Sequence, residues 1–138
     1  MGFRQFKKAD IPQLLLWFDD PDIQSHLSGF DPPEEQFELI LKHVNRWAYV
    51  WEDQGEIQAF AEVELEEDWV NLLIMVKAKS RKRGLGKKML LYLQSQKLAP
   101  YYHAYIDPKN TASIACFRQV GFRFVEEEKG MEKWEWKN

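Results

Sequence analysis

Apolar residues recur along the chain at two different spacings. Over residues 57–65 they alternate mostly with polar ones, which predicts a strand with one face on a core. Over residues 69–76 almost every residue is apolar, as in a central strand that is covered on both faces. Spacings of three and four residues predict four helices. These helices begin near Ile11, Glu34, Leu85 and Thr111.

Turn-forming residues mark where these elements begin and end, which gives their order along the chain. Asp10 as N-cap and Pro12 in the first turn mark the start of the first helix. Residues 19–33 hold too many turn-forming side chains for regular structure, and Pro100 and Gly121 end the two later helices. The predicted order is β-α-α-β-β-β-α-β-α-β-β, an α/β arrangement with hairpins in the first half and crossover helices in the second.

Length and composition limit the class of protein. The 138 residues suit one domain, residues 1–138, and 45% hydrophobic with 14% aromatic residues supply a dense core. A net charge of -3 disfavours nucleic acid, whose phosphates demand clustered cations. The single cysteine, Cys116, excludes an intrachain disulfide, and no segment approaches the roughly 20 apolar residues of a membrane span. We therefore expect a cytoplasmic protein with no membrane partner.

A cationic turn joins the apolar strand to the third predicted helix. It reads Arg81-Lys82-Arg83-Gly84-Leu85-Gly86-Lys87. Helix N-termini normally attract acidic side chains, whereas here every charged residue is cationic and opposes the helix dipole unless an anion lies there. The turn has neither the spacing of a Walker loop nor the three glycines of the dinucleotide fingerprint. It predicts a site for a phosphate group of another class of ligand, with a plain solvated turn as the alternative.

This turn resembles the acetyl-CoA-binding signature of the GNAT N-acetyltransferases, Arg-x-x-Gly-x-Gly, with Arg81, Gly84 and Gly86 at the fixed positions. Residues 110–122 are similar to the family's later motif, in which an Asn opens a helix and an aromatic residue and Gly-Phe follow. The resemblance covers about residues 57–126. It implies the GNAT fold: one mixed, mostly antiparallel sheet of six to seven strands, splayed at the acetyl-CoA site and flanked by about four helices.

By this resemblance acetyl-CoA is the acyl-donor substrate. The strand before the turn offers its backbone to the pantetheine arm and thioester, and the turn holds the pyrophosphate. Asn110 either binds the pantetheine or is only a helix N-cap. No metal is expected, because the three histidines are scattered. The implied coenzyme-binding residues are Ile74, Met75, Val76, Arg81, Lys82, Arg83, Gly84, Leu85, Gly86, Lys87, Asn110 and Phe117.

The implied reaction is direct attack of a primary amine on the thioester. An alkylamine near pH 7 is almost fully protonated, and freeing its lone pair costs about 4 kcal/mol, so a base or ordered water should lie nearby. Glu62 and Glu64 share one face of a predicted strand and are the candidate bases, with Glu64 preferred. Asp68 and Asn71 lie near the start of the next strand. A solvated stripe of glutamates is the alternative interpretation.

Phe117 is the clearest departure from the family pattern. Many members carry at this position a tyrosine that is thought to protonate the departing thiolate, and phenylalanine cannot donate a proton. Water, Tyr102 or Tyr105 takes this role instead, or efficient catalysis has been lost. A non-catalytic acyl-CoA-binding or sensing module is therefore the alternative function.

The acceptor and the partners follow less directly. Candidate acceptors are a small polyamine-like or aminoglycoside-like molecule, a peptide N-terminus or a lysine, bound by the first two helices and residues 19–33. The cationic residues 77–88 offer a nucleic-acid-binding alternative, which the net acidity disfavours. Trp134 and Trp136 share one face of the last predicted strand, which indicates either an exposed homodimer contact or aromatic packing over the second predicted helix.

Overall fold

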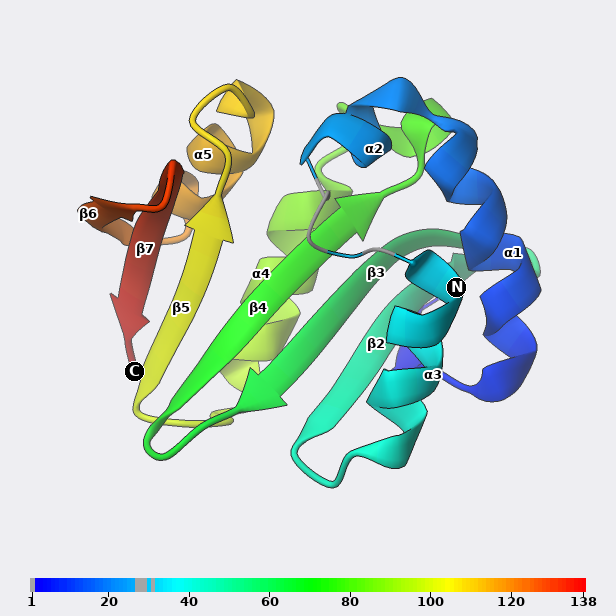
Figure 1. Ribbon diagram of the computed structural model, residues 1–138, viewed down its shortest axis with the longest axis horizontal. Helices are drawn as coiled ribbons and strands as arrows, with labels where there is room; N and C mark the ends of the chain where they lie inside the picture. The colour runs from blue at the N-terminus through cyan, green and yellow to red at the C-terminus, as the bar shows by residue number, and fades with distance from the viewer. Residues whose placement is uncertain (1, 27–29, 31) are drawn as a thin grey trace.

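Seven strands form one mixed sheet in the order β1-β2-β3-β4-β5-β7-β6 (Figure 1). The computed structural model describes residues 2–26, 30 and 32–138. Every neighbouring pair is antiparallel except β4 and β5, which run parallel. The predicted mixed, mostly antiparallel sheet is thus confirmed. The strands are β1 (Gly2–Gln5), β2 (Arg46–Asp53), β3 (Glu56–Leu65), β4 (Trp69–Val76), β5 (Tyr101–Ile106), β6 (Arg123–Glu128) and β7 (Met131–Lys137).

Five α-helices flank the sheet in the described part of the chain, where about four were expected. The additional helix, α2, lies within residues 19–33, where irregular structure was predicted; that prediction was wrong over Pro21–His26, while residues 27–29 and 31 lie outside the described residues. Pro21 takes the first position of α2, where the missing N–H of proline is not needed, so a residue read as a break begins a helix. The helices are α1 (Ile11–Leu15), α2 (Pro21–His26), α3 (Pro33–Lys42), α4 (Leu85–Ser95) and α5 (Thr111–Gln119), with short 3-10 turns at Lys8–Asp10, Leu16–Asp19 and Ala78–Ser80.

Each face of the sheet has its own hydrophobic core. Helices α1, α2 and α3 cover one face, where Phe37 and Phe60 are fully buried. Helices α4 and α5 cover the other, where Met89 and Tyr102 are fully buried. Figure 1 shows α3 in front of the sheet and α4 behind it. Successive side chains of a strand point to opposite faces, so Phe60 and its neighbour Ala61 belong to different cores.

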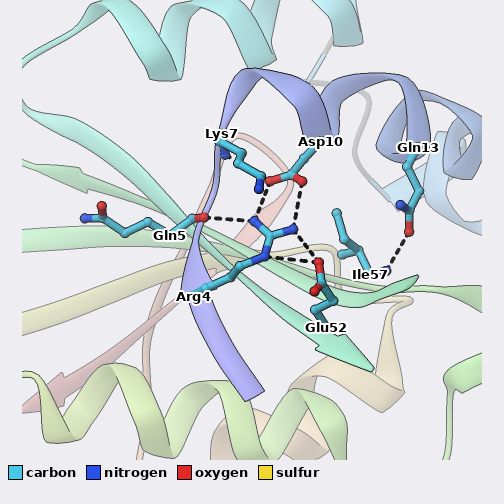
Figure 2. Close-up of polar contacts among 7 residues, drawn as sticks. All are labelled: Arg4, Gln5, Lys7, Asp10, Gln13, Glu52 and Ile57. Atoms are coloured by element: carbon cyan, nitrogen blue, oxygen red, sulfur yellow. Dashed lines mark hydrogen bonds and ion pairs between the residues drawn. The ribbon is translucent and has the colours of Figure 1, made fainter. Parts of the chain in front are cut away.

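Asp10 is buried, and its side chain does not cap the first helix as predicted. Its carboxylate accepts hydrogen bonds of 2.8 and 2.9 Å from the Arg4 guanidinium and one of 2.9 Å from the Lys7 N–H (Figure 2). Arg4 also donates to Glu52 of β2, at 2.6 and 3.1 Å. Burial alone raises the pKa of Asp10, but the Arg4 and Lys7 hydrogen bonds outweigh burial, and the pKa is lowered. The network ties β1, β2 and the start of α1 together.

The tryptophan face of the last strand is packed inside the molecule. Trp134 is buried, with the Arg118 guanidinium of α5 5.4 Å from its ring centroid. Trp136 packs against Tyr102 and Phe122, at centroid distances of 5.0 and 6.4 Å. The two tryptophans thus pack against α5 and the neighbouring strands and not over the second predicted helix, α3, so the prediction of that helix as their partner was wrong.

Strands β4 and β5 pair over only four residues before they separate. The parallel ladder begins with Trp69 opposite Tyr101 and ends with Leu72 opposite Ala104. Strand β4 continues its pairing with β3 as far as Val76. Figure 1 shows the two strands diverging, β4 toward α2 and β5 toward α5. The sheet is thus splayed between its central strands, as the resemblance implied.

Candidate active site

Two cavities meet where the sheet splits. The larger cavity, about 550 Å³, lies beside α4 and α5, and the smaller cavity, about 270 Å³, reaches the face covered by α3. Both are lined by Ile74 of β4 and by Asn110, Ser113 and Phe117 around α5. Groups that bind on opposite faces of the sheet can therefore meet at the split.

The larger cavity brings together nearly all the residues predicted to bind the coenzyme. The exception is Arg83, whose exposed side chain lies outside the lining. The predicted residues that do line it are Ile74, Met75, Val76, Arg81, Lys82, Gly84, Leu85, Gly86, Lys87, Asn110 and Phe117.

The start of α4 favours an anion in this cavity. Gly84 precedes the helix in the left-handed region, with a φ of 76°, and no side chain of the described residues caps the helix. The first turn holds no acidic residue, while Lys82 and Lys87 line the cavity beside it. The helix dipole and these cations together suit a phosphate group.

The backbone of β4 faces the split at alternate residues. Lys77 donates its N–H to the Gln58 carbonyl at 2.9 Å, which makes the adjacent cross-strand pair, Ala59 and Val76, a non-hydrogen-bonded pair. The N–H and C=O of Val76 therefore point away from β3, and those of Ile74 do the same by alternation. They face the side from which β5 has separated, so a ligand in the split can pair with them.

Arg81 makes ion pairs that the sequence did not reveal. Its Nη2 lies 2.6 Å from Asp20 Oδ2, and its Nη1 lies 3.2 Å from Asp22 Oδ2. Asp20 directly precedes α2 and Asp22 lies in its first turn, so the cationic turn is tied to that helix. The charge of Arg81 is balanced within the protein, which leaves Lys82 and Lys87 to supply positive charge to an anionic ligand.

Gly86 allows α4 and α5 to approach closely beside the larger cavity. A Cβ atom at this position would lie 3.2 Å from Cys116 Sγ and 3.9 Å from Val76 Cγ2. A Cβ at Gly84 would meet nothing within 4 Å. The helix contact thus accounts for Gly86, and the left-handed backbone accounts for Gly84.

We expect the effect of Gly86→Ala on stability to reverse sign when Cys116 is shortened. In the wild-type chain, overpacking against the sulfur costs about 1–3 kcal/mol and exceeds the helix-propensity gain of about 1 kcal/mol. In a Cys116→Ala background the opposing atom is gone, and the propensity gain should dominate. Denaturant unfolding of the four proteins of this cycle measures the coupling, and additive effects would contradict it.

The aromatic residues near the split divide into structural and accessible ones. Phe117 is buried between the two cavities. Tyr102 is fully buried, donates its hydroxyl to the Leu93 carbonyl at 2.6 Å and accepts from the Leu98 N–H at 3.0 Å, so the suggestion that it protonates the thiolate was wrong. Tyr105 is 37% exposed and lines the smaller cavity.

Asn110 caps α5 at the junction of the two cavities. Its Oδ1 accepts a hydrogen bond of 3.2 Å from the Ser113 N–H. The helix-cap role is therefore confirmed, and contact with the pantetheine stays a prediction.

Four polar side chains line the smaller cavity from one face of the sheet: Arg46, Glu62, Glu64 and Asn71. The register places Glu64 opposite Arg46 of β2 and opposite Asn71 of β4, with Glu62 two residues along the same face. Arg46 Nε lies 3.3 Å from Oε2 of both glutamates. Both predicted bases thus reach the cavity, whereas Asp68 does not line it.

Glu62 is the more buried of the two glutamates. Its side chain is 9% exposed, against 31% for Glu64. Burial raises the pKa of Glu62 to about 7, an effect that Arg46 opposes and the charge of Glu64 strengthens. Arg46 Nε and Glu62 Oε2 are close as charges, but neither has a hydrogen-bond partner among the described residues. A carboxyl group with this pKa exchanges a proton readily at neutral pH.

A histidine beside the four polar side chains of the smaller cavity was not predicted from the sequence to lie there. His103 lies opposite Asn71, and its Nε2 is 2.7 Å from Glu135 Oε2.

In the described part of the chain, no group of three or more His, Cys, Asp and Glu side chains could hold a metal ion. None of the described helices is long and apolar enough to cross a membrane.

The split sheet and the anion-favouring helix start define an acetyltransferase domain. A family model described as an acetyltransferase (GNAT) domain matches residues 1–123. The chain belongs to the GNAT family and is an acetyltransferase. No curated protein matches its sequence at a significant level.

Solved structures share the fold over nearly the whole chain. The GNAT domain of PAT from S. lividans has a TM-score of 0.86 at 15% identity and covers 99% of this chain and 89% of its own. An aminoglycoside acetyltransferase solved with coenzyme A has a TM-score of 0.82 at 17% identity, covering 99% and 94%. A ribosomal-protein-alanine N-acetyltransferase from Brucella melitensis has a TM-score of 0.79 at 19% identity, covering 100% of both chains.

Proposed function

We propose that this chain is an acetyl-CoA-dependent N-acetyltransferase that acts on a primary amine by direct attack on the thioester. The observation that carries the proposal is the meeting of two cavities at the split, one with an anion-favouring helix start and one with a buried carboxyl group whose pKa is about 7. We assign this activity to one domain, residues 1–138, in the cytoplasm.

The larger cavity fits acetyl-CoA. The start of α4, with Lys82 and Lys87, suits the pyrophosphate, and the outward-facing backbone groups of Ile74 and Val76 suit the pantetheine arm. The coenzyme A bound to the aminoglycoside acetyltransferase of the same fold supports this choice. We place the thioester at the split beside Phe117, where both cavities are lined by the same residues.

The amine then enters from the smaller cavity, with Glu62 as the base. The nitrogen bonds to the carbonyl carbon, the carbon–sulfur bond breaks, and one proton passes from nitrogen to Glu62. The Val76 N–H faces the split and can stabilise negative charge on the carbonyl oxygen. The thiolate leaves with the electron pair, and Tyr105, which lines this cavity, is the side chain that we assign to protonate it.

Release of free thiol from acetyl-CoA tests this function. A panel should contain small primary amines, polyamines, aminoglycosides and peptides, and at least one should give thiol release that depends on both the protein and the amine. If acetyl-CoA raises the melting temperature but no amine gives release, the non-catalytic acyl-CoA-binding module is favoured. If acetyl-CoA neither stabilises the chain nor is consumed, both functions are excluded.

A further inference from the structure

Five buried polar atoms of the described residues lack a hydrogen-bond partner, and three of them belong to side chains that line the smaller cavity. Among the described residues these atoms are Trp17 Nε1, Arg46 Nε, Glu62 Oε2, Asn71 Oδ1 and His103 Nδ1. Buried polar atoms are nearly always paired, so each exception requires an explanation. Two of the five are acceptor oxygens of residues that line the cavity: Glu62 Oε2, which has the charge of Arg46 Nε at 3.3 Å but accepts no hydrogen bond from a described residue, and Asn71 Oδ1.

The register places the two residues that carry these oxygens close together on one face of the sheet. Glu64 lies opposite Asn71, so Glu62 and Asn71 are diagonal neighbours on the same face of β3 and β4. The backbones of diagonal neighbours on two adjacent strands lie roughly 7–8 Å apart, which is close enough for both side chains to contact one small group. Asn71 also precedes Leu72, the last residue of β4 that pairs with β5. Both residues therefore lie next to the split.

Two acceptor oxygens match the donors of one kind of nucleophile. A neutral primary amine has one lone pair and two N–H groups. During attack the lone pair must point at the thioester carbon, which leaves both N–H groups to be bound. A secondary amine has one N–H and would leave one of the two oxygens unpaired.

We propose that Glu62 and Asn71 recognise the two N–H groups of a primary amine and that Asn71 is a specificity-determining residue. This rests on the proposed function and extends it to the choice of acceptor. As the carbon–nitrogen bond forms and the carbon–sulfur bond breaks, the proton facing Glu62 passes to that carboxylate, and the proton facing Asn71 stays on the amide nitrogen. A cavity of about 270 Å³, about nine times the volume of a water molecule in the liquid, admits a small amine or the end of a longer one.

The test compares the best primary amine of the panel with its N-methyl derivative. For the wild-type protein, kcat/KM should favour the primary amine by about 5- to 150-fold, the range expected when one buried polar atom loses its partner. Asn71→Leu keeps the approximate size of the side chain but removes the oxygen, and should lower kcat/KM for the primary amine while bringing the ratio close to one. Asn71→Asp retains an acceptor oxygen and should keep a clear preference.

Controls separate recognition from structural damage. The melting-temperature rise caused by acetyl-CoA should be the same in the wild-type protein and the three Asn71 variants, and Asn71→Ala gives the same contrast as Asn71→Leu if the leucine variant does not fold. Gln36→Leu alters another polar residue of the cavity and should leave the ratio unchanged. If primary amines are turned over but the wild-type ratio is near one, or Asn71→Leu does not alter that ratio, this inference is overturned. The proposed function then still stands. If no amine reacts, both are overturned.

Discussion

Replacing Glu62 with Gln should lower kcat by about 10²- to 10⁴-fold and at the same time make the folded protein more stable above pH 7. The loss of rate is the typical contribution of a positioned general base. The gain of stability arises because glutamine carries no charge into the buried site. A change that harms activity and helps stability is unusual for a side chain with only a structural role.

The sign of the stability change follows from the pKa of Glu62. Burial raises the pKa from 4.5 to about 7, so between these pH values the folded protein holds a proton that the unfolded chain has released. The stabilisation is present in full below about pH 4.5 and is lost as the pH rises through about 7. The whole change is about 3 kcal/mol. The Gln variant lacks this decline, so its advantage over the wild type should be larger at pH 8 than at pH 5.

Two measurements check this expectation, with Glu64→Gln as the matched control. Urea unfolding at pH 5 and pH 8 measures stability, and the pH profile of kcat/KM measures the base. The more exposed Glu64 should give smaller changes in both. If Glu62→Gln retained wild-type activity and its pH profile of kcat/KM still changed near pH 7 as in the wild type, Glu62 would not be the base.

Replacing Arg4 with Met should destabilise the protein by about 3–5 kcal/mol, because it leaves the buried carboxylate of Asp10 without its charged partner. The loss should be largest at neutral pH. Stability owed to the lowered pKa of Asp10 is present above its ordinary value of 3.8 and is lost as the pH falls through the lowered value. Without Arg4 the pKa of Asp10 rises, and protonation at acidic pH removes the uncompensated charge.

Urea unfolding of Arg4→Met at pH 7 and pH 4 measures this difference. The double variant Arg4→Met/Asp10→Asn has no carboxylate at position 10 and should recover part of the loss. A deficit under about 1 kcal/mol at pH 7, the size found for exposed ion pairs, would show that this network contributes little.

The pattern of apolar and turn-forming residues was sufficient to predict the seven strands, because the residues that form and end each strand lie within it or beside it. It failed at α2, where Pro21 and the neighbouring aspartates were read as a break. It failed again at Asp10, whose carboxylate binds Arg4 instead of the helix start. In both places the deciding partner lies outside the short window in which caps and turns are recognised.

At the candidate site, too, local features could be predicted from the sequence and contacts between distant residues could not. The cationic turn was found because glycines and cations act locally on a helix start. The ion pair of Arg81 with Asp20 joins residues that are 61 positions apart, and no local pattern reveals it. Aligning the predicted hairpin outward from its turn would place Arg46 opposite Val63, on the other face, and it is the β-bulge between Trp51 and Glu52 that brings Arg46 opposite Glu64. Burial distinguishes Glu62 from Glu64, and burial depends on how α3 and the neighbouring strands cover the sheet.

Strand β7 reaches its place in the sheet after both of its neighbours have been synthesised. It lies between β5 and β6 and pairs with both, so a nascent chain that has not yet reached Met131 presents open strand edges on both of these strands. Open edges invite pairing with other chains. Lys129 and Gly130, with φ values of 52° and 82°, join β6 to β7 in a two-residue turn of the hairpin type. The two strands can therefore close as a hairpin and dock on β5 together, which shortens the time during which a newly made chain is open to aggregation.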